Sequence, residues 1–293
     1  MKFASETLTT WNNFTERLRK LSSISDKWVY KGLDQNYNLA TTLDRAREYF
    51  DIDGSEIPGI EEQMIRNFRR RIQEERNDEL IKDRLYCMSL MQHHGSPTRL
   101  MDFTWSPYIG AFFAIDTSTN PPYAPEYVPV LWCINISWIE ETIKKLVNNK
   151  VLRDRWCDKL RNDKTFISMY MSKRTRKFVY LENPLRLNTR LVIQQGIFLV
   201  PGDVTCSYED NLKSHHGWNN KKNILKIFLD FTKQERKIAL HELHRMNISQ
   251  ASLFPGLDGY ARSMKQLIPI FERMSKNKAG KGGPFKTKFK NCI

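Results

Sequence analysis

A polar loop followed directly by an apolar segment is the feature that most constrains the fold of this chain. The run 92–102 carries imidazole, hydroxyl, guanidinium and carboxylate groups around a glycine and a proline, a composition typical of functional loops. Residues 108–114 are apolar or aromatic at helical spacing. Thr104 or Ser106 can cap a helix that begins near Pro107. We therefore expect a site loop that is held in place by a buried helix.

Hydrophobic periodicity predicts further elements around this loop. Helices are expected over 11–21, 61–75, 82–92, 138–163 and 233–246, with a last helix ending near 274. Strands are expected over 28–30, 128–136 and 224–229, and one or two more over 187–200. The segment 215–218 is expected to be an exposed loop, and Gly32 to permit a turn after the first strand.

Positive charge is concentrated in two segments of a chain whose formal net charge is +14. Residues 144–177 hold twelve Lys or Arg against three acids, and residues 273–293 hold seven and no acid. Clustered cations bind polyanions because they release condensed counterions, so RNA, DNA or a nucleic-acid-associated protein is an expected partner. The alternatives are a solvated helix face and a flexible basic tail over 276–293. The candidate nucleic-acid contacts are Lys173, Arg174, Arg176 and Lys177.

The cysteine spacing and the hydropathy of the sequence indicate the cellular compartment in which the protein is expected. Five cysteines are widely spaced and never form a CxxC pair, which disfavours a disulfide framework and a zinc knuckle; no metal site is expected. The first ten residues lack a signal-peptide pattern, and no run of about 18 apolar residues occurs. We expect a cytoplasmic protein with reduced, mostly buried cysteines and no membrane partner, and the sequence leaves its oligomeric state open.

Several motifs resemble the FRG domain family, a bacterial group named after a Phe-Arg-Gly triplet. They are Tyr30-Lys31-Gly32, the acidic-then-basic helix 62–70, the central run 92–104, Arg190 with 194–198, and the segment 253–259. The resemblance covers residues 25–265, after an N-terminal helix within 1–24 and with a basic helical insertion at 138–178. Lys31 stands where the family has Arg, which keeps the charge but loses the planar fork.

A second set of matches resembles ADP-ribosyltransferases of the arginine-serine-glutamate type. The three strand motifs correspond to 30–32, to 102–104 with the helix 107–114, and to 195–202, where Gln195 takes the place of the catalytic Glu. The resemblance implies an α+β fold with a split β-sheet core and helical insertions. It also implies NAD as co-substrate of a toxin or antiphage effector that modifies a nucleic acid or a translation component. The alternatives are a non-catalytic module that binds a nucleotide or RNA, and an NAD glycohydrolase.

The resemblance assigns roles to eight residues. The catalytic set is His94, Asp102, Thr104 and Gln195, and the dinucleotide-binding set is Lys31, Gly32, Gln92 and Arg99. Because an amide lacks the charge that stabilises the cation formed as nicotinamide leaves, Asp102 or another carboxylate would have to replace Gln195.

Structural alternatives stand beside these roles. Arg99 and Asp102 can form a buried pair, Thr104 can cap the following helix, and Lys31 can lie on the surface. In an extended chain, adjacent side chains point to opposite sides. We therefore expect His94 in the site with His93 outside it, and Gln194 on the face opposite Gln195.

Overall fold

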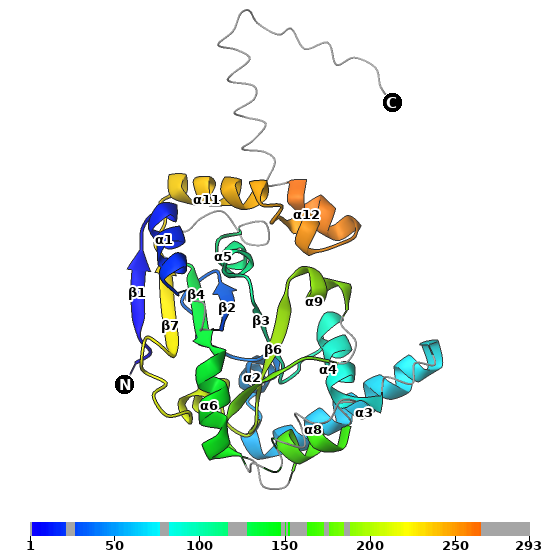
Figure 1. Cartoon of the computed structure of the whole chain (residues 1–293). Coiled ribbons are helices and arrows are strands. Elements are labelled where there is room, and N and C mark those ends of the chain that lie inside the picture. Colours follow the sequence, from blue (N-terminus) through cyan, green and yellow to red (C-terminus); the bar gives the residue numbers. More distant parts are fainter. Residues whose placement is uncertain are drawn as a thin grey trace, which may run out of the picture.

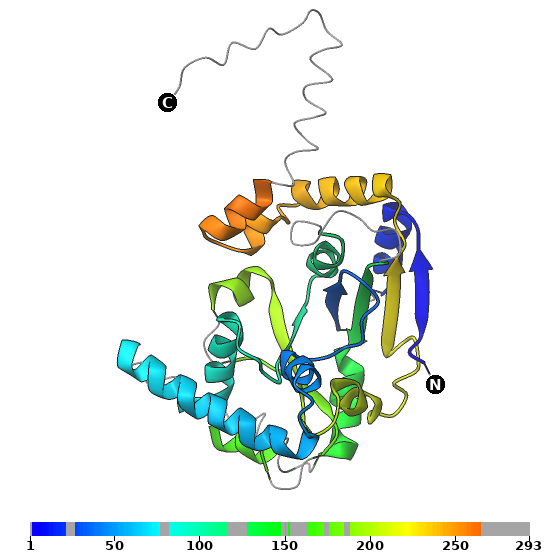
Figure 2. The ribbon, with the colours of Figure 1, turned by 180° about the vertical axis from the view of Figure 1, so that it is seen from behind.

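The computed structural model describes residues 2–21, 27–76, 82–116, 128–147, 150, 152, 163–172, 176–184 and 188–264. Helices cover both faces of a seven-stranded sheet (Figures 1 and 2). Its order is β1-β7-β4-β2-β3-β6-β5, with β1 and β7 parallel and the other neighbours antiparallel. The strands are β1 (Ser5–Leu8), β2 (Trp28–Leu33), β3 (Met101–Thr104), β4 (Val130–Asn135), β5 (Val179–Glu182), β6 (Gly196–Pro201) and β7 (Ile224–Leu229). The expected α+β class is confirmed.

The helices form two layers around this sheet. The layer that packs on one face contains α1 (Trp11–Leu21), α5 (Pro107–Ile115), α11 (Lys233–Arg245) and α12 (Gln250–Leu253). The layer on the other face contains α3 (Ile57–Arg76), α4 (Arg84–His93), α6 (Ile136–Leu146) and α8 (Asp163–Tyr170). Shorter elements complete the fold: α2 (Thr42–Tyr49), η1 (Gly54–Glu56), α9 (Thr189–Ile193), α10 (Tyr208–Lys213) and a helical segment 257–264.

The central strand β4 explains why its sequence is a continuous apolar run. Val130, Trp132 and Ile134 pack into the core with α3, α4 and α6. Leu131 and Cys133 pack into the opposite core with α1, α5 and α11. A strand that alternates its side chains between two buried layers needs apolar residues at every position.

The sheet is held together most weakly between β2 and β3. These strands are paired at Tyr30 and Thr104, whereas β2 pairs with β4 along its whole length and β3 with β6 likewise. The described strands therefore form one open sheet whose two halves meet at a single residue pair. Past this pair, Lys31 and Gly32 on β2 diverge from Phe103 and Asp102 on β3, and the space between the strands becomes available for a site.

The N-terminal helix is part of the same core. Trp11 of α1 stacks on Phe14 and meets the edge of Phe231 next to α11. The backbone N–H of Trp11 donates to the Glu235 carboxylate over 2.9 Å. Helix α1 therefore packs within the layer formed by α5 and α11.

Several predicted elements differ from the structure. The segment expected as strands over 187–200 contains the short helix α9 and a turn before β6. The segment 215–218 is only in part the expected exposed loop: His216 is exposed, but His215 is fully buried and hydrogen-bonds Thr142 and the backbone of Val179. Burial lowers the pKa of His215 to about 4.

Two predicted regions fall partly or wholly outside the described residues. The basic tail 276–293 lies outside them. Within the insertion 138–178, the helix expected over 138–163 ends early, because α6 stops at Leu146 and Val147 is extended. The apolar side of α6 faces the core as expected. The free cysteines of the described chain are Cys87 and Cys133, both buried, and Cys206, half-buried.

No helix within the described segments is both long and apolar enough to cross a bilayer.

Gly32 is required by packing and not by a turn. A Cβ at this position would lie 2.0 Å from the Gly110 carbonyl oxygen and 2.5 Å from the Ala114 backbone nitrogen, both in α5. Neither backbone atom can rotate away, so β2 and α5 approach this closely only with glycine.

We expect Gly32→Ala to lower the free energy of unfolding by about 1–3 kcal/mol, because added volume must displace α5. Urea unfolding followed by circular dichroism measures this change. Gly59→Ala is the matched control, since nothing lies within 4 Å of its added Cβ. An equal loss in the two variants would contradict the packing explanation.

Candidate functional site

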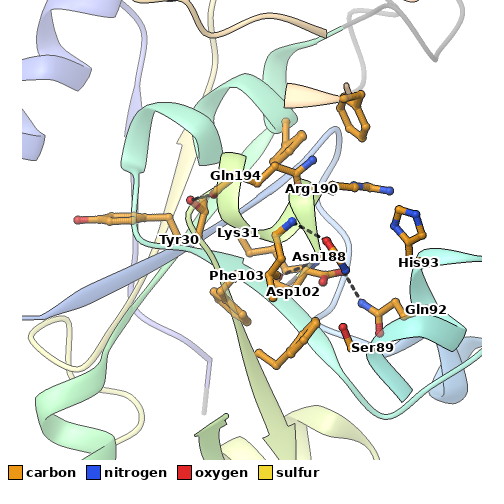
Figure 3. A pocket seen from close by; sticks show the side chains of 16 residues that line it. Tyr30, Lys31, Ser89, Gln92, His93, Asp102, Phe103, Asn188, Arg190 and Gln194 are labelled. Atoms are coloured by element: carbon orange, nitrogen blue, oxygen red, sulfur yellow. Dashed lines mark hydrogen bonds between the residues drawn. The ribbon is translucent and has the colours of Figure 1, made fainter. Parts of the chain in front are cut away.

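A cavity of about 320 Å³ opens where β2 and β3 diverge. It is lined by β2, α4, β3, α5, α9, β6 and the turn after α12. Its polar lining residues are Lys31, Ser89, Gln92, His93, Asp102, Thr104, Asn188, Arg190 and Gln194, and its aromatic lining residues are Tyr30, Phe103, Phe113, Phe198 and Phe254. Figure 3 shows Lys31, Asp102 and Gln92 close together, with Arg190 beside His93.

Lys31 enters the cavity from the point of divergence. Its Nζ donates to the backbone carbonyl of Asp102 over 3.1 Å, so the amine bridges the gap between β2 and β3. Burial lowers the pKa of Lys31, and the nearby Asp102 charge opposes this shift. The sequence predicted a strand over 28–30 that ends before Lys31, whereas β2 continues to Leu33 and includes Lys31.

Asp102 is held by Gln92. The Gln92 Nε2 donates to Asp102 Oδ2 over 2.5 Å, and the Gln92 Oε1 accepts from the Thr98 hydroxyl. Asp102 is the acidic residue in the cavity lining, so any carboxylate chemistry there depends on it.

Arg190 supplies a second positive charge. Its guanidinium carbon lies 4.6 Å from the centroid of the Phe254 ring, a cation–π distance. Burial lowers the pKa of Arg190, with Asp102 opposing and Arg262 assisting the shift. Arginine nevertheless stays charged at any physiological pH.

The structure places His93 in the cavity lining and leaves His94 out of it. Helix α4 ends at His93, and His94 is its C-cap residue. The expectation that His94 faces the site is thus wrong, because it assumed an extended segment where a helix ends. Burial lowers the pKa of His93, with His94 and Arg190 adding to the shift.

The Thr104 hydroxyl connects neighbouring segments of the structure by hydrogen bonds. It is buried, its hydroxyl donates to the Gln194 carbonyl over 2.7 Å, and it accepts from the Ser106 N–H over 3.1 Å. Ser106 itself caps α5 by accepting from the Ile109 N–H. Thr104 lines the cavity, but its hydroxyl proton is already used in joining β3 to the turn before β6.

Gln195 lies away from the cavity. It is exposed, has a left-handed φ of 48°, and occupies the turn between α9 and β6. Its neighbour Gln194 lines the cavity and donates from Nε2 to the Leu253 carbonyl over 3.0 Å. The expected positions of the two glutamines are therefore reversed, because the segment turns where a strand was predicted.

Arg99 belongs to the core and not to the cavity. It is 1 % exposed, and its guanidinium binds both carboxylate oxygens of Glu61 and donates to the Tyr170 carbonyl over 2.9 Å. The alternative of a buried ion pair is correct in kind. The expected partner, Asp102, is wrong.

The basic cluster expected to bind nucleic acid is only partly visible. Lys173 and Arg174 lie outside the described residues. Arg176 and Lys177 are exposed, and Arg176 donates to the Leu146 carbonyl over 3.1 Å. Neither residue lines the cavity.

Sequence reasoning missed several lining residues that come from distant elements. Arg190 belongs to a family motif that gave it no role, and Phe254 belongs to a motif that reads as a structural turn. Asn188 caps α9, a helix that the apolar pattern does not reveal. Its Asn-Thr start is the local signal that identifies a helix there.

No curated protein and no solved structure shows significant similarity to the chain. Within the described residues, no group of three or more His, Cys, Asp or Glu side chains is arranged to hold a metal ion. Residues 26–122, which include β2, α4 and β3 with Lys31, Gln92 and Asp102, match the family model of the FRG domain.

Proposed function

We propose that the cavity binds a nucleotide, with its phosphate between Lys31 and Arg190 and its ribose hydroxyls on Asp102. The observation that carries this proposal is that two cations and one held carboxylate share a cavity with several aromatic rings. The two cations suit a phosphate, the carboxylate suits the hydroxyls of a sugar diol, and the aromatic rings suit a planar base.

The charge balance favours an anionic ligand. Burial destabilises the charged forms of both Lys31 and Arg190, and Asp102 alone is the carboxylate among the lining residues. A bound phosphate would restore charge-assisted hydrogen bonds to both cations. Its binding energy would therefore include the relief of a desolvation cost.

The aromatic wall suits a planar ring. Phe113 and Phe254 lie edge to face with centroids 6.1 Å apart, and both line the cavity. The volume of about 320 Å³ is near the lower end of the range for small-molecule sites, about 300–1,000 Å³. This size fits a mononucleotide or one half of a dinucleotide such as NAD.

ADP-ribosyl transfer from NAD is the second candidate, and the position of Asp102 favours it. In such a reaction the bond from ribose C1′ to nicotinamide breaks, nicotinamide leaves with the electron pair, and an acceptor attacks C1′ as it loses a proton. A carboxylate near C1′ stabilises the developing cation. Asp102 is available for this role in the cavity, whereas Gln195 is outside it. An effector that modifies a nucleic acid or a translation component would act in this way.

Incubation with NAD labelled in the nicotinamide ring separates these candidates. Binding without release of nicotinamide indicates a nucleotide-binding module, and release that needs cellular RNA or protein indicates transfer. Release without an acceptor indicates NAD hydrolysis. Asp102→Asn should abolish any release, while Gln195→Glu, outside the cavity, should leave it unchanged. If the protein binds neither NAD nor adenosine monophosphate, the nucleotide proposal is overturned.

Nucleic acid as the macromolecular partner is a separate proposal, supported by the clustered charge of residues 144–177. Replacing Lys173, Arg174, Arg176 and Lys177 with Ser should weaken binding to single-stranded RNA. The slope of log affinity against log salt should fall by about 0.7 for each phosphate that is no longer neutralised. Fluorescence anisotropy over a salt series measures the slope, and an unchanged slope would remove these residues from the interface.

A further inference from the structure

The Asp102 carboxylate is the end of a chain of hydrogen bonds that begins outside the cavity. Thr98 is 1 % exposed, and its hydroxyl donates to Gln92 Oε1, while Gln92 Nε2 donates to Asp102 Oδ2. Thr98 is anchored in turn by α2: its N–H donates to the Thr42 hydroxyl over 2.9 Å, and its carbonyl accepts from the Leu43 N–H over 3.1 Å.

The direction of this chain is fixed by the number of protons. The Thr98 hydroxyl accepts from the Leu100 N–H over 3.3 Å, and its single proton is given to Gln92. A carboxylate oxygen only accepts, so the NH₂ of Gln92 must face Asp102 and its oxygen must face Thr98. An amide oxygen cannot donate, which matches the proton that the Thr98 hydroxyl presents to it. The network thus has one consistent arrangement.

We infer that Thr98 and Gln92 are positioning residues that hold the Asp102 carboxylate with Oδ1 turned to the ligand, and that the site thereby selects a ribose diol over a deoxy sugar. This inference rests on the proposed nucleotide site. Among the described residues, none donates a hydrogen bond to Oδ1 of Asp102. The two hydroxyls of a ribose can supply the hydrogen-bond donors that Oδ1 lacks within the described protein.

The expected selectivity arises because a deoxy sugar lacks the hydroxyls that donate to Asp102. A hydroxyl that donates to a carboxylate gains a charge-assisted bond, whereas its absence leaves the acceptor without a ligand partner. Because the cavity is open to solvent, water can replace part of this bond, and the expected preference for adenosine monophosphate over its 2′,3′-dideoxy analogue is about tenfold. A carboxylate free to rotate would lose most of this preference.

The test compares Thr98→Val with Thr98→Ser by calorimetric titration of three probes: adenosine monophosphate, its 2′,3′-dideoxy analogue and inorganic phosphate. Thr98→Val keeps the shape but removes the donor to Gln92, so we expect the tenfold preference to vanish while phosphate affinity is unchanged. Thr98→Ser restores the hydroxyl and should restore the preference. If Thr98→Val does not fold, Gln92→Met takes its place in the test. Gln92 is a half-buried residue of α4, and its replacement removes the donor to Asp102. Preserved discrimination in Thr98→Val, or a parallel drop in phosphate affinity, would overturn the inference.

A measurement without ligand separates this inference from the nucleotide proposal. Selective ¹⁵N labelling of glutamine reports the exchange of the Gln92 side-chain NH₂ with solvent. We expect Thr98→Val to speed this exchange about tenfold and Thr98→Ser to leave it near the wild-type rate. If the wild type binds none of the three probes, the nucleotide proposal and the diol preference fail together, and this exchange rate alone still decides whether Thr98 positions Gln92. Equal exchange in wild type and Thr98→Val would remove Thr98 from that role.

Discussion

Replacing Arg99 with Met is expected to lower the free energy of unfolding by about 3–5 kcal/mol. The change leaves Glu61, itself 1 % exposed, as an unpaired charge in the core. It also removes the donors to the carbonyls of Tyr170 and Pro201, which tie α8 and the end of β6 to the start of β3. Urea unfolding followed by circular dichroism measures the loss.

Two further variants sharpen this test. Arg245→Met removes an exposed ion pair with Glu242 and should cost no more than about 1 kcal/mol. Combining Glu61→Leu with Arg99→Met should recover part of the loss, because neither charge is then left alone. If Arg99→Met instead folds with wild-type stability and fails to bind nucleotide, Arg99 is the cofactor residue that the sequence suggested.

Replacing both Lys31 and Arg190 with Met should weaken the binding of NAD about a hundredfold. Each cation contributes a hydrogen bond to a charged group, worth about 1.5–3 kcal/mol, and partial exposure keeps the effect near the lower value. Each single variant should therefore lose about tenfold. Isothermal titration at low salt measures these affinities.

His94→Ala and Gln195→Glu are the matched controls for this prediction. Both residues are exposed and lie outside the cavity lining, so NAD affinity should stay at its wild-type value. A loss in either control equal to that of the double variant would place the ligand elsewhere on the molecule.

Local sequence signals predicted the elements whose ends are determined by neighbouring residues. Helix α5 begins after the Ser106 cap with Pro107 in its first turn, and α11 begins after the Thr232 cap, both as expected. Strand β7 was predicted with its observed bounds. In each case the cap or the apolar run lies within or next to the element itself.

The elements that were missed depend on partners far away in the sequence. Strand β1 has the polar sequence Ser5–Leu8 and is a strand because it pairs with β7 at the edge of the sheet. Helix α9 spans only five residues, too short for a periodic pattern to show. An edge strand and a single helical turn leave little trace in hydrophobicity.

The same limit applies to the site. The composition of the run 92–102 singled out a segment that contributes to the cavity, since Gln92, His93 and Asp102 line it. Two features decide which side chains of this run line the cavity. Helix α4 ends at His93, and Arg99 is paired with a buried carboxylate. That partner, Glu61, lies 38 positions away, and a pattern of neighbours cannot reveal such a pairing.

Mapping of nucleotide-induced shifts in the amide spectrum tests the central claim most directly. On addition of adenosine monophosphate to the ¹⁵N-labelled wild-type chain, the resonances of Lys31, Gly32, Gln92, Asp102 and Arg190 should move together and saturate with one affinity. Those of Arg99, Gln195 and Lys177 should stay in place. Saturable shifts confined to residues outside the cavity, or no shifts with adenosine monophosphate and with NAD, would contradict a nucleotide site between β2 and β3.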